Sequence, residues 1–142
     1  MLTEEELAKI KDLGATAAIV MHYGGNDWSQ AQINGLQTQF GAMGIEVIAV
    51  TDAGFKPEIQ VSDLETIMAQ SPDIIVSIPT DPTATASAYR AAAKAGAKLV
   101  FMDNIPAGFV PGTDYVSVVS ADNYGNGVAA AHLMAKALGP DG

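Results

Sequence analysis

The sequence feature that most constrains the fold is a series of five short apolar runs spread along the whole chain. Each run is five or six residues long, which is the length of a β-strand. The apolar residues are consecutive rather than alternating, and this pattern is typical of strands covered on both faces. The five runs are residues 17–22, 46–51, 73–78, 98–102 and 115–120.

Helical segments separate most of these runs. Residues 26–43, 56–70 and 82–95 have helical character and end at a glycine or before a proline, whereas a Gly- and Pro-containing loop joins the last two runs. A capping box at Thr3 and Glu6 opens a further helix, and residues 123–138 form the last one. The order predicts an α/β fold, a doubly wound parallel five-stranded sheet with helices on both faces, of the flavodoxin-like type.

Composition narrows the function classes. Seven Lys and Arg residues stand against 16 Asp and Glu residues, for a net charge of −9. This balance argues against binding to nucleic acid or anionic membranes, which requires basic patches. There is no cysteine, which removes thiol catalysis, disulfides and thiolate metal sites. With 142 residues, 49% of them hydrophobic, the chain can build the core of one ordinary domain.

No apolar run approaches the ~18 residues of a membrane span, and the longest, around residues 15–21, is strand-sized. Met1 and Leu2 are followed at once by Thr3 and three glutamates, so the start lacks the basic and apolar regions of a signal peptide. Met1 is therefore either a native cytoplasmic start or a start codon added where a leader was removed.

Polar residues gather where the predicted strands end. Residues 22–28 follow the first strand, Asp52 the second, Asp81 the third, Asp103 with Asn104 the fourth, and residues 120–123 the fifth. In a parallel sheet these positions share one edge, which is where open α/β sheets bind ligands. We expect Asn26, Trp28, Asp81 and Asp103 to lie on one surface there.

Each polar residue also has a purely structural interpretation. Asp52 and Asn123 are suited to capping helices, as is Asp81 before Pro82, and a single Trp is often a core residue. The clustering and the position of Trp28 in a Gly-rich loop favour a binding site instead. Carboxylates accept hydrogen bonds from hydroxyl groups and an aromatic ring covers C–H groups, so the predicted ligand is a sugar or polyol.

Motifs for other chemistry are weak. Residues 125–130 read G-x-G-x-x-A, but the glycines come about five residues after the strand, and no acidic residue follows at the spacing of a dinucleotide site. His22 and His132 lack metal-ligand neighbours, and an acid–base pair of Asp81 and Asp103 would have no nucleophile. We therefore expect no enzyme activity, no catalytic residue, no metal and no cofactor.

Five segments, in order, resemble the first lobe of type I periplasmic binding proteins, especially the ribose-binding-protein-like sugar-binding group. They include the first strand with its loop, the third strand with Asp81, and the segment after the fifth strand; Asn26 and Trp28 match a binding Asn and an aromatic residue. The segments are residues 18–28, 34–35, 73–81, 98–103 and 120–125.

The resemblance implies the solute-binding lobe of an ABC-transporter substrate-binding protein, periplasmic once its leader is removed, with a membrane permease as partner. Residues 1–120 would be the N-terminal ligand-binding lobe, and residues 121–142 the hinge crossing and first helix of a second lobe that is otherwise missing. The candidate ligand-binding residues are Tyr23, Asn26, Asp27, Trp28, Asp81, Asp103, Asn104 and Asp122.

Two departures from the family pattern widen the ligand class. Asn104 stands where the family often has Arg, and Asp27 and Ser29 flank Trp28 where it often has Pro and a second aromatic residue. The ligand can therefore be a sugar other than a pentose, a polyol or another polar solute.

Two other functions remain open at this stage. The effector-binding core of a lactose-repressor-like transcription regulator shares the fold but usually follows a helix-turn-helix, whereas here one acidic helix precedes the first strand. A small flavodoxin-like enzyme or phosphate-binding domain would need motifs that the chain lacks. For the lobe that the family resemblance implies, the apolar side of helix 123–138 would lack its second-lobe partner and a sheet edge would stay uncovered, which predicts a homodimer.

Overall fold

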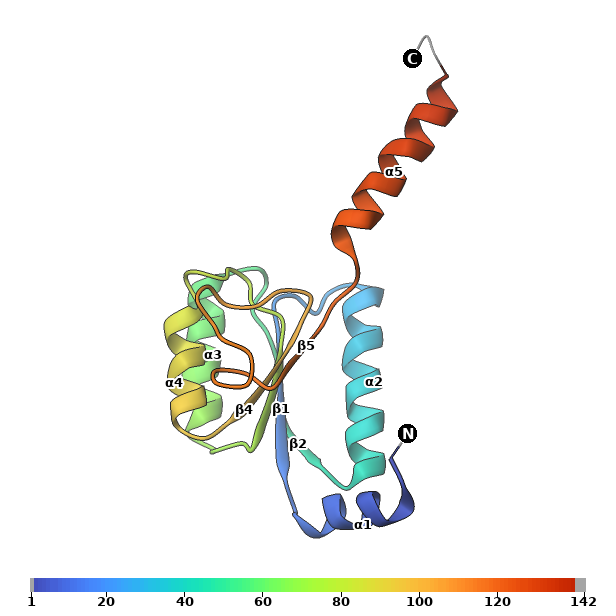
Figure 1. Ribbon diagram of the computed structural model, residues 1–142. Helices are drawn as coiled ribbons and strands as arrows, with labels where there is room; N and C mark the ends of the chain where they lie inside the picture. Colours follow the sequence, from blue (N-terminus) through green and yellow to red (C-terminus); the bar gives the residue numbers. More distant parts are fainter. Residues whose placement is uncertain (1, 140–142) are drawn as a thin grey trace.

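A five-stranded, all-parallel sheet forms the centre of the molecule, in the order β2-β1-β3-β4-β5 (Figure 1). The computed structural model describes residues 2–139. Met1 and residues 140–142 lie outside the described part, so the end of the predicted crossing segment 121–142 is not included. The sheet confirms the predicted fold class. Its strands are β1 (Thr16–Met21), β2 (Glu46–Asp52), β3 (Ile74–Ser77), β4 (Lys98–Met102) and β5 (Ser117–Val119).

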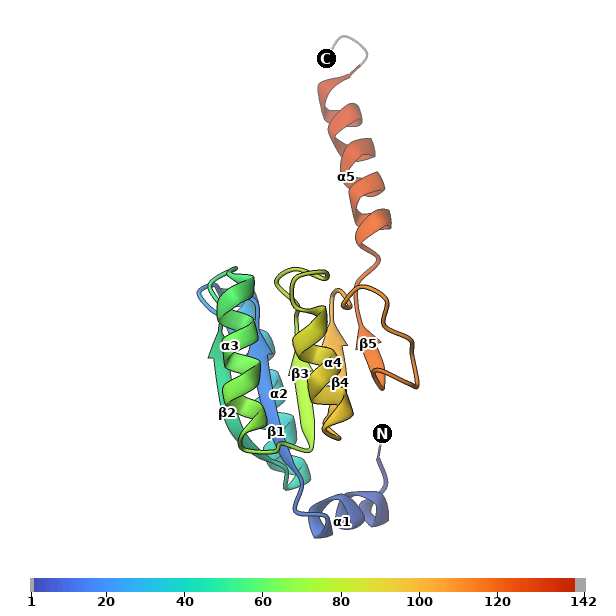
Figure 2. The same ribbon diagram turned by 90° about the vertical axis from the view of Figure 1, so that its left-hand side faces the viewer.

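Helices cover the sheet from both sides (Figures 1 and 2). Helix α2 lies on one face, α3 and α4 lie side by side on the other, and α1 packs against α2. Helix α5 projects away from the rest of the chain, beyond the edge at which the strands end. The helices are α1 (Glu4–Asp12), α2 (Asp27–Met43), α3 (Pro57–Met68), α4 (Ala86–Lys94) and α5 (Asn123–Leu138).

The core has two parts, one on each side of the sheet. Phe101, Leu64 and Tyr89 belong to the larger cluster, between the sheet and the pair α3 and α4. Ile19 and Ile33 belong to the smaller cluster, between the sheet and α2. Strand β1 contributes to both clusters because its side chains alternate between the faces, which explains its continuous apolar sequence.

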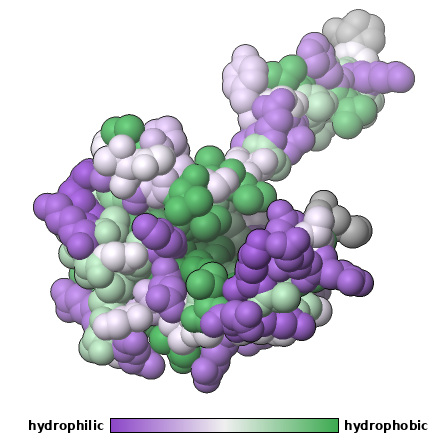
Figure 3. All heavy atoms as spheres, turned by 60° about the horizontal axis from the view of Figure 1, so that its bottom comes forward, coloured by the Kyte–Doolittle hydropathy of each residue, from purple (hydrophilic) through white to green (hydrophobic). Residues whose placement is uncertain are grey.

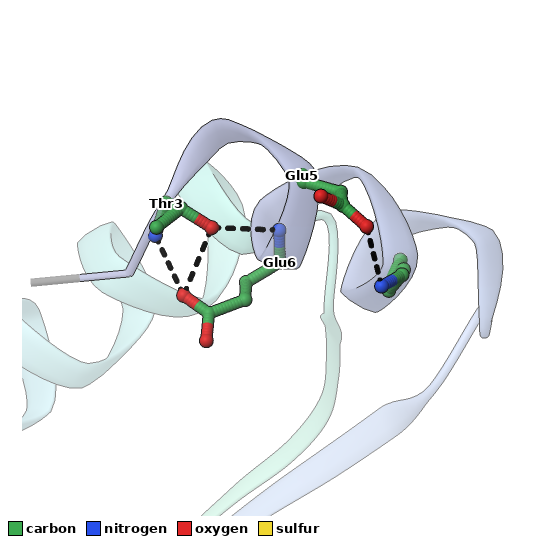
Figure 4. Close-up of polar contacts among 4 residues, drawn as sticks. Thr3, Glu5 and Glu6 are labelled. Carbon is green, nitrogen blue, oxygen red and sulfur yellow. Dashed lines mark hydrogen bonds and ion pairs between the residues drawn. The ribbon is translucent and has the colours of Figure 1, made fainter.

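The capping box predicted from the sequence is present at the start of α1 (Figure 4). The Glu6 amide donates to Thr3 Oγ1 at 3.2 Å, and the Thr3 amide donates to Glu6 Oε2 at 2.7 Å. Lys9 and Glu5, one turn apart, form an exposed ion pair at 2.7 Å. The two bonds between Thr3 and Glu6 satisfy amides at the helix start that have no partner within the helix.

Several predicted boundaries shift by one or two residues, and three local predictions differ more clearly from the structure. Strand β5 has three residues because only Ser117–Val119 pair with β4. Helix α4 begins at Ala86 rather than residue 82, because Asp81 and the residues after it first form turns. Trp28 lies in the first turn of α2 rather than in the Gly-rich loop, because Asn26 caps that helix.

We expect Asp73 to contribute to stability only above acidic pH. Its Oδ2 accepts hydrogen bonds from the Thr16 amide at 2.8 Å and from Thr16 Oγ1 at 3.1 Å, which lowers the pKa of this carboxyl group below its ordinary value of 3.8. Because the pKa is lower in the folded state than in the unfolded state, the ionised carboxyl group stabilises the fold above the unfolded-state pKa. This stabilisation is lost as the pH falls through the folded-state pKa.

Urea unfolding of the wild type and of Asp73→Asn, at neutral pH and in steps below 3.8, tests this expectation. The stability difference between the two proteins should shrink on acidification, whereas the surface variant Asp12→Asn should show no such change. A difference that stays constant across the acid range would contradict the assignment.

Candidate functional site

The carboxyl ends of all five strands meet at one edge of the molecule, below the start of α5 (Figure 1). A cavity of about 550 Å³ opens there, and Trp28, Asp103 and Asn123 contribute to its lining. The edge therefore brings together an aromatic ring, a carboxylate and an amide from three distant parts of the sequence.

The loop after β1 presents Trp28 to solvent. Asn26 Oδ1 accepts a hydrogen bond from the Ser29 amide at 2.8 Å and so caps α2, while Gln30 Nε2 donates to the Gly24 carbonyl oxygen at 2.6 Å. These contacts fix the start of the helix, and Trp28 in its first turn remains 55% exposed. The ring is thus not a core residue.

An aromatic cluster beside Trp28 was missed by the sequence analysis. The His22 ring meets Trp28 and Phe55 edge-on, with centroid distances of 6.1 and 5.0 Å, and Tyr23 stacks on Phe55 at 4.8 Å. Phe55 follows β2 with a φ of 61° and is 60% exposed. Its amide donates to the His22 carbonyl oxygen at 2.7 Å, which holds this left-handed residue in place.

Asp81 is ionised and firmly held. Its Oδ1 accepts hydrogen bonds from the amides of Ala84 at 2.7 Å and Thr83 at 2.8 Å, and these bonds lower the pKa of the carboxyl group. Among residues 2–139, no hydrogen bond to Oδ2 is present. One carboxylate oxygen thus serves the turn, and the other can accept a bond from a ligand hydroxyl group.

Asp103 and Asn104 follow β4. Asp103 has a φ of 66° and accepts a hydrogen bond from Asn123 Nδ2 at 2.8 Å. Asn104 Nδ2 donates to the Pro79 carbonyl oxygen at 3.3 Å, which joins this loop to the one that carries Asp81. Asn104 Oδ1 is buried and has no hydrogen-bond partner among the described residues, so Asn104 acts here through its amide group, which joins the two loops.

His22 is neutral at pH 7. Burial lowers the pKa of its imidazole below the ordinary value of 6.5, and the negative charges of Asp103 and Asp52 oppose this effect without reversing it. Within the described part of the chain, buried Nδ1 also lacks a hydrogen-bond partner. The edge therefore combines ionised carboxylates with neutral aromatic surface.

Of the eight candidate ligand-binding residues, only Trp28 and Asp103 line the cavity; Asn26, Asp81 and Asn104 lie outside its lining, as do the other three. Tyr23 is half-buried with its hydroxyl over Gly25, Asp27 is exposed in the first turn of α2, and Asp122 caps α5 by accepting from the Gly125 amide at 2.9 Å. All three helix-capping interpretations are wrong, since the residues that precede α3, α4 and α5 are Lys56, Thr85 and Asp122 rather than Asp52, Asp81 and Asn123.

Two further features of the described residues concern metal binding and membrane crossing. Across residues 2–139, no three His, Asp or Glu side chains lie close enough together to hold a metal ion. None of the helices in that range has the length and apolar character needed to cross a membrane.

Comparison with solved structures places the fold among transport proteins. An ABC-transporter solute-binding protein from Agrobacterium vitis, bound to α-D-tagatopyranose, is 25% identical with a TM-score of 0.76, over 87% of this chain and 43% of its own. An arabinose-binding protein from Geobacillus stearothermophilus is 26% identical with a TM-score of 0.72, over 87% and 41%.

A solute-binding protein from Mycobacterium smegmatis with bound glycerol shares the fold at 22% identity and a TM-score of 0.78, over 91% of this chain and 43% of its own. The chain thus spans less than half the length of these proteins. No curated protein sequence matches it significantly. The sequence profile of the periplasmic binding protein domain matches residues 17–142, and the chain therefore belongs to that family.

Proposed function

We propose that this chain is the ligand-binding lobe of an ABC-transporter solute-binding protein and that it binds a sugar or polyol without chemical change. The observation that carries the proposal is the exposed Trp28 ring beside Asp103 in the cavity at the carboxyl edge. Two relatives support the same ligand class: the protein from Agrobacterium vitis is bound to α-D-tagatopyranose, and the one from Geobacillus stearothermophilus is an arabinose-binding protein.

The chemistry of the edge matches a polyhydroxylated ring. The carboxylates of Asp103 and Asp81 accept hydrogen bonds from hydroxyl groups, and Trp28 covers the C–H face of the ring. Asn104 supports the site by joining the loops that carry the two carboxylates. We include Tyr23, Asn26, Asp27 and Asp122 as outer contacts. The matched relatives are transport proteins, which does not favour the alternative of a transcription-regulator core.

Replacing Trp28 with alanine is expected to weaken sugar binding by roughly tenfold or more, because stacking on an exposed ring contributes about 1.4 kcal/mol. NMR titration of the labelled chain with tagatose, arabinose and glycerol measures the dissociation constant. Tyr124→Ala is the matched control, since Tyr124 is an exposed aromatic residue on α5 with 85% of its surface accessible. Equal losses in both variants, or no binding by the wild type, would contradict the proposal.

We further propose that residues 1–120 form the ligand-binding lobe and that residues 121–142 cross toward a second lobe. The support is the position of α5, which projects away from the sheet (Figure 2). Several of its large apolar side chains are exposed. In this arrangement the protein acts in the periplasm after removal of a leader, and both lobes contact the membrane permease.

The isolated chain is expected to form dimers. Apolar side chains are exposed both on α5 and at the sheet edge formed by β5. Figure 3 also shows a hollowed area with apolar residues on one face of the molecule. Burial contributes about 1.5–3 kcal/mol for each large aliphatic side chain, and charge repulsion is screened beyond ~8 Å at physiological salt. The exposed apolar side chains include Val118 and Val119 on β5 and Val128, Met134 and Leu138 on α5.

Sedimentation equilibrium at micromolar concentrations measures the association. The wild type should have the mass of two chains, and the double variant Met134→Glu, Leu138→Glu should have the mass of one. A single-chain mass for the wild type would contradict the prediction.

A further inference from the structure

A buried glutamine lies directly behind the loop that carries Asp81. Gln60 belongs to α3 and is fully buried, so its side chain cannot contact a ligand in solvent. Its Nε2 donates to the Ile78 carbonyl oxygen at 2.9 Å. Its Oε1 accepts from the Thr80 amide at 2.7 Å and from Thr80 Oγ1 at 3.0 Å. One side chain thus forms three hydrogen bonds to two residues of this loop.

Three other polar backbone groups of the same loop are also bonded. The Ile78 amide donates to the Val20 carbonyl oxygen at 3.2 Å, and Asn104 bonds the Pro79 carbonyl oxygen. The Asp81 carbonyl oxygen accepts from Thr85 Oγ1 at 2.6 Å. Residues 78–81 are therefore attached to β1, α3, the loop after β4 and the turn before α4. Gln60 supplies the attachment in the middle of this segment.

We propose that Gln60 is a positioning residue for the ligand site, because it fixes the loop at Ile78 and Thr80 and thereby sets the direction in which Asp81 presents its carboxylate. This inference rests on the proposed function of the edge as a sugar site. Fixing a binding group before the ligand arrives increases affinity because less conformational freedom is lost on binding.

A glutamine is well suited to this position. The loop offers a carbonyl oxygen at Ile78 and two donors at Thr80, so the partner must both donate and accept at the end of a side chain of this length. A methionine of similar volume would leave all three groups unpaired. A glutamate has this shape when protonated, but when ionised it has no hydrogen to donate to Ile78.

The test uses amides that Gln60 does not contact. Those of Thr83 and Ala84 donate to Asp81 Oδ1 and report whether Asp81 stays in place. In the full chain with Gln60→Met, their hydrogen exchange relative to the Val76 amide should rise about tenfold, and the pKa of Asp81 should move up toward its ordinary value. Gln60→Glu, which keeps the acceptor, should restore part of the protection.

Tyr89→Phe is the matched control. Its hydroxyl is also buried and bonds Ser77, one residue before Ile78, so its loss destabilises the same region without touching the loop. It should leave the exchange ratio unchanged. Unchanged ratios in Gln60→Met, with only a lower global stability, would overturn the proposal and assign Gln60 a purely structural role.

Sugar titration gives the second measurement. In a chain that keeps Trp28, Gln60→Met should weaken the binding of arabinose or tagatose by about tenfold. Tyr89→Phe should leave this binding unchanged. If the wild type binds neither sugar nor glycerol, the proposed function fails, but the exchange ratios still decide whether Gln60 positions Asp81.

Discussion

Replacing Phe101 with alanine is expected to lower the free energy of unfolding by about 3–5 kcal/mol. Phe101 is fully buried in β4, in the middle of the larger core cluster. Its ring meets Tyr89, Phe109 and Tyr115 edge-on, with centroid distances of 5.2, 6.0 and 5.7 Å. The substitution would remove all three contacts and leave a cavity between rigid elements that cannot collapse to fill it.

Urea unfolding followed by circular dichroism measures the loss. Because small domains are stable by only about 5–15 kcal/mol, the variant should unfold at a much lower urea concentration than the wild type. Leu13→Ala is the control, since Leu13 is 76% exposed and its truncation should have little effect. A loss below about 1 kcal/mol for Phe101→Ala would show that this aromatic cluster does not hold β4 to α4.

The sheet could be predicted from sequence because burial on both faces leaves a local signal. Residues 98–102 were predicted as a strand and are observed as Lys98–Met102. The last strand was predicted to be six residues long and has three, because pairing with β4 alone decides where it ends. Strand pairing joins residues far apart in sequence, and a local apolar pattern does not report it.

The site was predictable as an edge but not as a set of contacts. The sequence placed Trp28 and Asp103 after strands, and both line the cavity. It missed Phe55, whose ring reaches His22 and Tyr23 only because a left-handed turn after β2 directs it there. It also missed Gln60, which looks like an ordinary polar residue within a helix until its distance to Thr80 is known.

The second large effect concerns ligand affinity. The chain is expected to bind its sugar at least about 100-fold more weakly than a form of the protein that carries a second lobe, which corresponds to about 2.7 kcal/mol. Small-molecule sites bury most of the ligand surface, whereas the proposed site on this edge would contact a ligand from one side only. Hydroxyl groups on the open side would stay in water and contribute nothing to affinity.

Isothermal titration calorimetry with the same sugar compares the two forms. The two-lobed form can be a longer product that includes this chain, or a fusion with the second half of the arabinose-binding protein from Geobacillus stearothermophilus, which is about twice as long. The Trp28→Ala substitution should weaken both forms, because the stacking surface belongs to this lobe in each. Equal affinity of the two forms would mean that the edge beside Trp28 and Asp103 encloses the ligand by itself, and the two-lobe arrangement would then be unnecessary for binding.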